Sequence, residues 1–450
     1  MSLKNSQLGR PVEFDSGRSP SSSADGQLIT VGIFSFLGYL FLAFYSRGTF
    51  GEPNLVGFFT CIALVGLPAV GLFTFATRQG REFSITNILF WATLLRLCGL
   101  LGVPLFEDDY FRYLWDGYRF ATDGTPYGTT PFEFFDDPSV PQSFQLILNG
   151  INYPDLPTIY GPTTEVAFLI AFWLTPGKLV GLQLILIFMD VALIWLMRTE
   201  CSSRFLFLYA FCPLVIKEIA FTAHPEAIGI LCLVGAVMCR KRNAEVPLGI
   251  LLGLAIGARV FAWILVPFLL LRTGWKVWAS LAVTLGLLYI PFVLQGATEF
   301  ETLSAFARYW EFNSFLYGML SQFAGSDLSR LVMGVLLACG ISLYLVKYYQ
   351  KTTFEIPRGD LLLGCLLLVS PVINPWYVVW LLPFAMVYPS FWAWTSTYAV
   401  FLSYVTALNL GLIDQDPFSQ PLWSRILQFA LVSAAICVDL LRWKSRLKTE

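Results

Sequence analysis

Long apolar runs recur along most of this chain, and they limit the folds that it can adopt. Eight of them hold about 20 residues, the length that a helix needs to cross roughly 30 Å of hydrocarbon. Because a helix satisfies its own backbone hydrogen bonds inside lipid, these runs predict an all-α polytopic membrane protein. The runs lie at about residues 28–46, 54–77, 83–104, 178–197, 277–295, 328–347, 391–412 and 424–442.

The composition agrees with a membrane protein and argues against several other classes. Only 13% of the 450 residues are charged, compared with about 25% in soluble domains. The formal net charge of -1 gives no general attraction to nucleic acid, so no such partner is predicted. All nine cysteines lie in or beside apolar segments, and we interpret them as small core residues, not as disulfides or metal ligands.

Shorter apolar pieces, broken by proline and glycine, separate the long runs. They are too short to span a bilayer comfortably, and broken backbone at membrane depth is tolerated where protein or a water-filled cavity covers it. We therefore expect an internal site beside them, and about 12–14 transmembrane helices in all. These pieces are 163–175, 205–222, 225–239, 246–258, 260–271, 360–372 and 376–389.

Basic residues predict the orientation, because cytoplasmic loops carry an excess of Lys and Arg. Clusters around Arg78, Arg198, Arg240, Arg272 and Lys347 mark one side, taken as cytoplasmic. A full crossing at 163–175 would move Arg198 to the other side, so we expect that piece to be re-entrant.

Composition and this orientation together predict the organisation of the rest of the chain. Residues 1–27 are rich in Ser, Gly and charge and lack the apolar core of a signal peptide, so they predict a disordered cytoplasmic tail. Residues 28–450 would form one transmembrane domain, with long extracytoplasmic loops at 105–162 and 296–327 that contain the candidate site residues discussed next.

The stretch LFEDDYFRYLWDG places Glu107, Asp108 and Asp109 at the end of an apolar run. Three acids would be costly in hydrocarbon, so they must meet water or a cationic ligand. The loop around them is rich in aromatic residues, including Tyr113 and Tyr160, which suit the faces of sugar rings. A membrane-interface aromatic belt with solvated acids is the alternative interpretation.

Isolated ionisable residues in the broken segments are further candidates. His224 and Glu226 fall at the outer end of a predicted helical hairpin, as a substrate contact or as a capping pair. Arg259 lies near the outer surface, where it could bind a phosphate or extend to lipid headgroups. Arg96 interrupts the third run, either as a buried carboxylate partner or as a phosphate contact. One histidine cannot make a zinc site here.

Two later motifs add aromatic and amide side chains on the same predicted side. WEFNSF supplies Trp310 and Asn313, and SPVINPWYVVWLLP supplies Trp376 and Tyr377. Each motif alone is typical of a membrane interface. Together with the acids, His224 and the arginines, they predict a cavity lined by acids, cations and aromatic rings.

At this point the chain resembles the GT-C superfamily of integral-membrane glycosyltransferases, in particular the bacterial group, including mannosyltransferases, that uses polyprenyl-phosphate sugars. The resemblance covers residues 105–383 and rests on EDDYFRYLWDG, GTPYG, LPTIYGP, CPLVIKEIAFTAHPEA, WEFNSF and SPVINPWYVVWLLP. This chain departs from the family's common residues at three sites, with Gly161 in place of proline, Glu226 in place of aspartate and Arg259 in place of lysine.

The resemblance implies a GT-C fold, with short juxtamembrane helices in its long first extracytoplasmic loop, and an enzyme of the bacterial inner membrane. It would transfer a hexose, mannose being one candidate, from a polyprenyl-phosphate donor to a hydroxyl of a lipid or glycan acceptor, with inversion. Multi-pass transport or lipid flipping is the rival function, although no internal repeat is visible. Neither the sugar, the acceptor nor an oligomeric state is predicted. No cofactor is expected, although EDD could in principle bind a divalent metal.

The resemblance also implies roles for individual residues. Asp109 would be the catalytic base, because family members place a tyrosine four residues later, where Tyr113 stands; Asp108 is the second candidate. Glu107 would orient the acceptor, while Arg259, with Arg96 or Arg112, would bind the donor phosphate. The expected substrate contacts are Tyr113, Tyr160, His224, Glu226, Trp310, Asn313, Trp376 and Tyr377, with His224 and Glu226 at the cavity rim.

Overall fold

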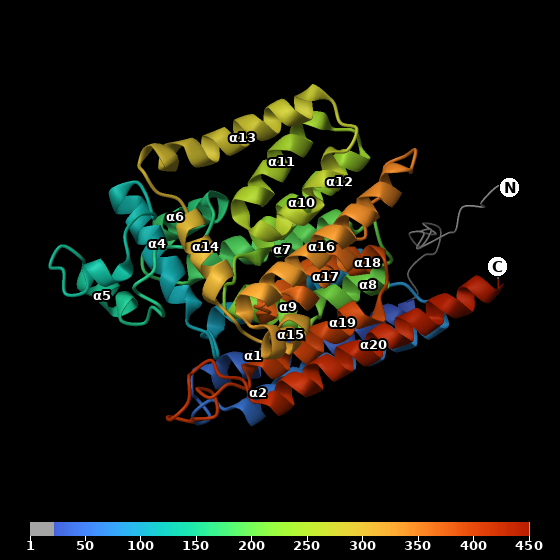
Figure 1. The fold of residues 1–450 in the computed structure, drawn as a ribbon. Helices are drawn as coiled ribbons and strands as arrows, with labels where there is room; N and C mark the ends of the chain where they lie inside the picture. The colour runs from blue at the N-terminus through green and yellow to red at the C-terminus, as the bar shows by residue number, and fades with distance from the viewer. Residues whose placement is uncertain (1–21, 450) are drawn as a thin grey trace.

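The computed structural model describes residues 22–449, and this part of the chain is all helical, without a β-strand (Figure 1). Within residues 22–449, six helices are long and apolar enough to cross a membrane. The prediction of an all-α polytopic membrane protein is therefore confirmed. These helices are α1 (Ser22–Ser46), α2 (Leu55–Gln79), α7 (Val180–Met197), α13 (Trp275–Leu294), α16 (Ser326–Tyr349) and α20 (Leu422–Thr449).

The broken pieces form shorter helices. Because their length does not show whether they cross the membrane, the total number of crossings stays a prediction. One pair, α9–η3 (Pro213–Val215 and Ile216–Phe221) with α10 (Glu226–Lys241), passes the same length and hydropathy test but bends by 116°. The predicted 12–14 crossings require shorter apolar helices to cross as well, including the one formed by the run at 83–104, which is shorter than the full span predicted for it. These are α3–η1 (Ile85–Leu97, Cys98–Leu101), α6 (Pro162–Leu174), α11 (Glu245–Ala258), η4–α12 (Val260–Leu265, Val266–Leu270), α17 (Gly359–Val369) and η5–α18 (Pro375–Leu381, Leu382–Val387).

Three expectations from the sequence need correction. The predicted tail includes residues 22–27, which belong to α1; its residues 1–21 lie outside the described part. The run at 391–412 is helical only in α19 (Phe391–Ala399) and η6 (Val400–Tyr404), because the chain then turns through Gly411, at a positive φ of 69°, and pairs backbone with residues 417–419. Cys339, Cys365 and Cys437 are exposed on apolar helices instead of lying in the core.

The basic connectors gather at one end of the helix bundle, as a chain of contacts shows. Arg204 pairs with Glu82 at 2.9 Å, and Lys241 pairs with Glu200 at 2.7 Å. Arg240 and Arg272 donate to backbone carbonyls of the neighbouring connectors near residues 271 and 349–351. The clusters used to predict the orientation therefore share one end.

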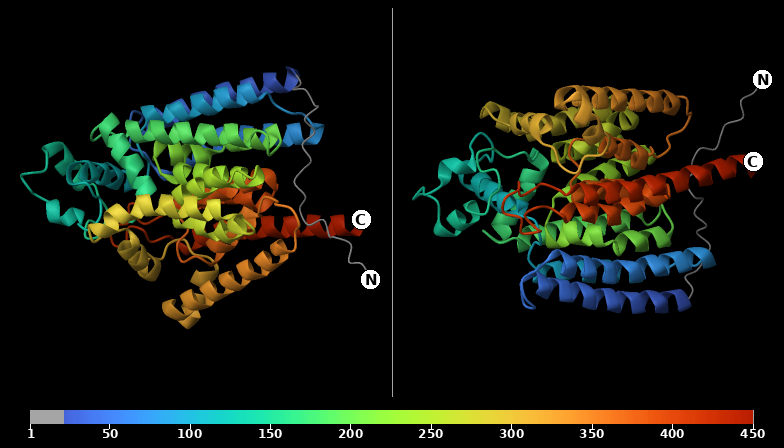
Figure 2. Two further views of the ribbon diagram at one scale, coloured as in Figure 1. Left: turned by 90° about the horizontal axis from the view of Figure 1, so that it is seen from above. Right: turned by 60° about the horizontal axis from the view of Figure 1, so that its bottom comes forward.

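The segment at 105–161 forms a layer at the opposite end from the C-terminus of α20 (Figure 2). It contains α4 (Asp109–Asp123), η2 (Pro131–Phe134) and α5 (Gln142–Leu148), which pack on a small hydrophobic core around Trp115 and Phe144. Helix α6 follows from this layer at Gly161 and returns to it at Gly177, which lies beside Phe144. Helix α6 thus begins and ends beside this layer, and the re-entrant path of this piece stays a prediction.

Three short helices remain, and of these only α14 borders the cavity described below. α8 (Ser203–Ala210) leads into the bent pair, and α14 (Phe300–Tyr309) and α15 (Leu316–Ala324) occupy the second predicted loop. Gly99 of η1 packs against η3 so closely that a Cβ would lie 2.3 Å from the carbonyl oxygen of Ala220. Gln183 of α7 donates to the backbone carbonyls of Gly99 and Ala220, which satisfies groups that irregular helices leave free.

Candidate functional site

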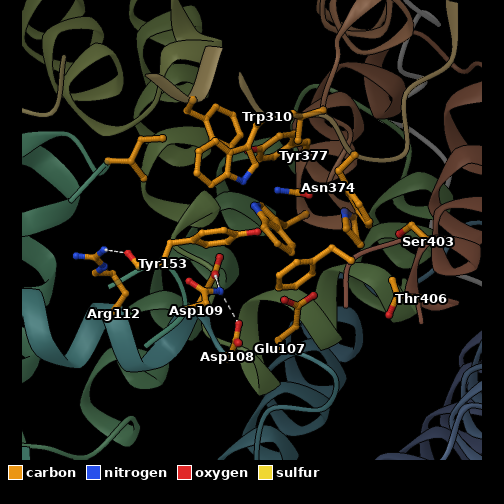
Figure 3. Close-up of a pocket in the computed structure, with 18 of the residues that line it drawn as sticks. Glu107, Asp108, Asp109, Arg112, Tyr153, Trp310, Asn374, Tyr377, Ser403 and Thr406 are labelled. Atoms are coloured by element: carbon orange, nitrogen blue, oxygen red, sulfur yellow. Dashed lines mark hydrogen bonds between the residues drawn. The ribbon is translucent and has the colours of Figure 1, made fainter. Parts of the chain in front are cut away.

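A cavity of about 680 Å³ lies beneath the 105–161 layer, between segments that are far apart in the sequence (Figure 3). In Figure 3 the three acids occupy one side, and Trp310, Tyr377 and Asn374 face them from the other. A volume of this size is within the usual range for small-molecule sites, about 300–1,000 Å³. Five sets of residues line it, at 106–112, 152–160, 302–312, 372–377 and 403–419, together with Arg259.

Asp108 and Asp109 begin helix α4, where the positive end of the helix dipole favours carboxylates. The side-chain amide of Asn152 donates to Asp108 Oδ1 at 2.7 Å and to Asp109 Oδ1 at 3.3 Å, so one amide holds both carboxylates. Burial, and then the charge of Asp109, raises the pKa of Asp108 to about 6. Phe106, with a positive φ of 58°, turns the chain just before them.

Behind Glu107 lies a buried group of charges that the sequence analysis did not assign. Lys217 Nζ is 3.8 Å from Glu107 Oε1 and 3.4 Å from Glu218 Oε1, and it donates to the hydroxyl of Tyr404. Tyr404 in turn donates to Glu218 Oε1 at 2.6 Å. Burial raises the pKa of Glu107 well above its usual range, and Lys217 opposes this shift.

His224 lies in the break between η3 and α10 and is fully buried. Ala223, at φ 58°, turns the backbone so that the imidazole stacks on Trp376 with ring centroids 3.7 Å apart. Its Nδ1 is 2.9 Å from Glu218 Oε2, and its Nε2 is 3.8 Å from Asp109 Oδ2. His224 therefore sits beneath the acids and not at the predicted rim, because the 116° bend directs it inward.

Arg259 lines the cavity from the end of α11. Its Nη2 donates to Glu226 Oε1 at 2.7 Å, and its guanidinium lies 4.7 Å from the ring centroid of Tyr160. The other oxygen of Glu226 accepts a hydrogen bond from the indole of Trp380. Glu226 is thus fully buried and not at the predicted cavity rim. From this buried position it binds the guanidinium of Arg259.

Several other predicted residues reach the cavity. Tyr160, Trp310, Trp376 and Tyr377 all line it. Arg112 lines it too, and donates to the backbone carbonyl of Leu156 at 2.6 Å.

Three predicted contacts lie elsewhere. Arg96 is fully buried and forms an ion pair with Asp190 at 2.5 Å, so it is the carboxylate partner of the two alternatives and does not line the cavity. Asn313 is buried and donates to the backbone carbonyl of Ile373 at 3.0 Å. Tyr113 is buried behind the wall, edge-on to Tyr160 with ring centroids 5.2 Å apart. These side chains support the site and do not border it.

Glu107, Glu218 and His224 are close enough to hold a metal ion, with one ligand atom of each within 4.8 Å of the others. Lys217, however, places an ammonium between the two glutamates, and Tyr404 already donates to Glu218. A second cation there would face that ammonium. The arrangement therefore fits a protein-supplied positive charge better than a metal site.

A second cavity, of about 390 Å³, shares Arg259, Tyr377 and Phe306 with the first. Most of its remaining lining is apolar, from η4, α16 and α17, and includes Trp263, Met333, Leu337, Leu366 and Val369. Arg259 thus borders a polar cavity on one side and an apolar one on the other.

Comparisons of this chain with protein-family models, with characterised proteins and with solved structures found no match.

Proposed function

We propose that this protein is a glycosyltransferase of the GT-C type that moves a hexose from a polyprenyl-phosphate donor to a hydroxyl acceptor. The observation that carries the proposal is that Asp109 and Arg259 line one cavity, together with Tyr160 and Tyr377. A reaction that removes a proton from a hydroxyl and releases a phosphate needs a carboxylate and a cation together.

The two cavities support a lipid-linked donor. A phosphate beside Arg259 would place a sugar in the polar cavity and a polyprenyl chain in the apolar one, which is bordered by the little-buried helix α16. A guanidinium binds phosphate through a planar fork of donors. Glu226, which accepts a hydrogen bond from the Trp380 indole, accepts another from Nη2 of that fork, so the arginine is positioned before any ligand arrives.

The residues would act in the following order. Asp109 takes the proton of the acceptor hydroxyl as the hydroxyl oxygen attacks the anomeric carbon. The bond from that carbon to the phosphate oxygen breaks, its electron pair leaves with the polyprenyl phosphate, and Arg259 stabilises the charge. Attack on the face opposite the leaving group inverts the anomeric configuration.

Glu107, Asp108 and the aromatic wall would recognise the sugars. Carboxylates accept hydrogen bonds from hydroxyls, and the rings of Trp310 and Tyr377 face them across the cavity. The enzyme would lie in a bacterial inner membrane with its N-terminus and basic connectors cytoplasmic and this cavity extracytoplasmic.

The test uses purified protein in detergent with radiolabelled polyprenyl-phosphate mannose or glucose and a panel of glycolipid and saccharide acceptors. We expect a new glycosidic bond and free polyprenyl phosphate with one pair. Glu355→Gln, at a surface ion pair with Lys351, is the matched control for acid-to-amide variants. Donor that stays intact throughout, while labelled lipid crosses proteoliposome membranes, would establish a transporter or flippase instead.

A further inference from the structure

The imidazole of His224 has its two nitrogens in different surroundings. Nδ1 lies 2.9 Å from Glu218 Oε2 and 2.9 Å from the hydroxyl oxygen of Thr222. Nε2 is buried, has no hydrogen-bond partner among the residues that the structure describes, and lies 3.8 Å from Asp109 Oδ2. His224 therefore connects a cavity carboxylate to a second carboxylate that does not line the cavity.

The neighbours of Nδ1 determine which nitrogen carries the proton. The Thr222 hydroxyl is within donating distance of the backbone carbonyl of Glu218, at 2.9 Å, so its oxygen can accept from Nδ1. Glu218 accepts at Oε1 from Tyr404 and faces Lys217, so its charge is compensated and Oε2 is an acceptor. Nδ1 is then the donor, and the lone pair of Nε2 points toward Asp109.

We propose that His224 and Glu218 form a proton relay behind Asp109, in which His224 Nε2 takes over the proton that Asp109 removes from the acceptor. This inference rests on the proposed function. As the glycosidic bond forms, the acceptor O–H bond breaks and the proton passes to Asp109 Oδ2. It then moves to Nε2, which gives an imidazolium whose Nδ1–H faces the Glu218 carboxylate, and Asp109 becomes a carboxylate again.

The packing around His224 fixes the directions in which its two ring nitrogens point. Trp376 covers one face of the imidazole, with ring centroids 3.7 Å apart, and Tyr113 lies edge-on to it, with ring centroids 6.3 Å apart, so the imidazole has little room to turn. His224 acts through Asp109 and does not line the cavity, so it is a positioning residue and not a catalytic one.

The chain contains a single histidine, which makes the relay directly observable. Nitrogen-15 labelled histidine gives one imidazole in the NMR spectrum of the whole protein. At neutral pH we expect a protonated Nδ1 and a bare Nε2 in the wild type and in the Glu355→Gln control. In Glu218→Gln the anion is lost, and we expect Nε2 to become protonated in part or in full.

Kinetics provide the second measurement. His224→Gln and Glu218→Gln should lower kcat about 100-fold, the usual size of an acid–base contribution, with little change in the donor KM. A wild-type Nε2–H tautomer, an imidazolium at rest, or an unchanged kcat in both variants would overturn the relay. The NMR result needs no substrate, so failure of the relay can be told from failure of the proposed transfer.

Discussion

Glu226 and Arg259 lie 33 residues apart in the sequence, and their side chains meet at 2.7 Å where the start of α10 faces the end of α11. The glutamate is fully buried, and only 12% of the arginine side chain is exposed. The pair therefore places one guanidinium at the junction of the polar and apolar cavities.

Arg259→Lys should weaken donor binding without unfolding the protein. The charge remains to compensate Glu226, but an ammonium lacks the planar fork that binds phosphate through two hydrogen bonds. We expect the KM for the lipid-phosphate donor to rise about 10-fold, as the loss of one charge-assisted hydrogen bond would produce. Arg308→Lys, at an exposed residue that does not line the cavity, should leave the KM unchanged. An equal KM in both variants would remove Arg259 from phosphate binding.

Asp109→Asn should abolish transfer while the protein still binds its donor. The amide has the same shape as the carboxylate and can still contact Asn152, but it cannot take a proton from the acceptor. We expect kcat to fall by at least about 100-fold, with thermal stability in detergent close to that of the wild type. Comparison with Asp108→Asn distinguishes the two acids: a larger loss in that variant would make Asp108 the base.

Asp108→Asn should stabilise the folded protein at neutral pH. Burial raises the pKa of Asp108 to about 6 from an ordinary value of 3.8, so the folded state binds this proton more tightly than the unfolded state does. The stabilisation that the proton gives is complete below pH 3.8 and is lost as the pH rises to about 6.

Thermal unfolding in detergent tests whether protonation of Asp108 stabilises the folded protein. The amide introduced by Asp108→Asn is neutral at every pH, so its burial carries no penalty for a charge. The melting temperature of this variant should therefore exceed that of the wild type at pH 7, and the gap should narrow as the pH falls toward 4. A gap that widens on acidification would show that Asp108 is stabilised as a carboxylate. The control Glu355→Gln removes a surface ion pair worth about 1 kcal/mol or less. We therefore expect little change in its melting temperature at either pH.

The cavity itself could be predicted because its wall is built from local signals. Acids at the end of an apolar run, and aromatic residues beside proline breaks, mark residues that must leave the hydrocarbon. Asp109, Arg259, Trp310 and Tyr377 accordingly line one cavity.

The supporting residues could not be predicted because their partners are distant in the sequence. Arg96 is paired by Asp190 of α7, and the run 205–222 gives no sign that Lys217 will meet Tyr404. Lys217 and Glu218 do interrupt an apolar segment, and this was the one available signal. The depth of His224 depends on the 116° bend, which neither hydropathy nor spacing determines.

Gly99→Ala should disturb both stability and the site, because this glycine sets the distance between η1 and η3. A Cβ would lie 2.3 Å from the carbonyl oxygen of Ala220, and that backbone cannot move without breaking the hydrogen bonds from Gln183. Overpacking of this kind costs about 1–3 kcal/mol. Glu107 follows η1 in the chain, and Lys217 belongs to η3. Moving η1 away from η3 should therefore lengthen the contact between Glu107 and Lys217, and kcat should fall.

Gly71→Ala is the matched control for this substitution. Gly71 lies inside α2, and no atom of the described residues lies within 4 Å of its added Cβ. Alanine should therefore stabilise that helix by up to about 1 kcal/mol. Thermal unfolding in detergent and the rate of transfer would be measured for both variants. Gly99→Ala should melt below the wild type and Gly71→Ala at or above it. If both variants had the same melting temperature and transfer rate, the close approach of η1 and η3 would have no part in holding Glu107 near Lys217.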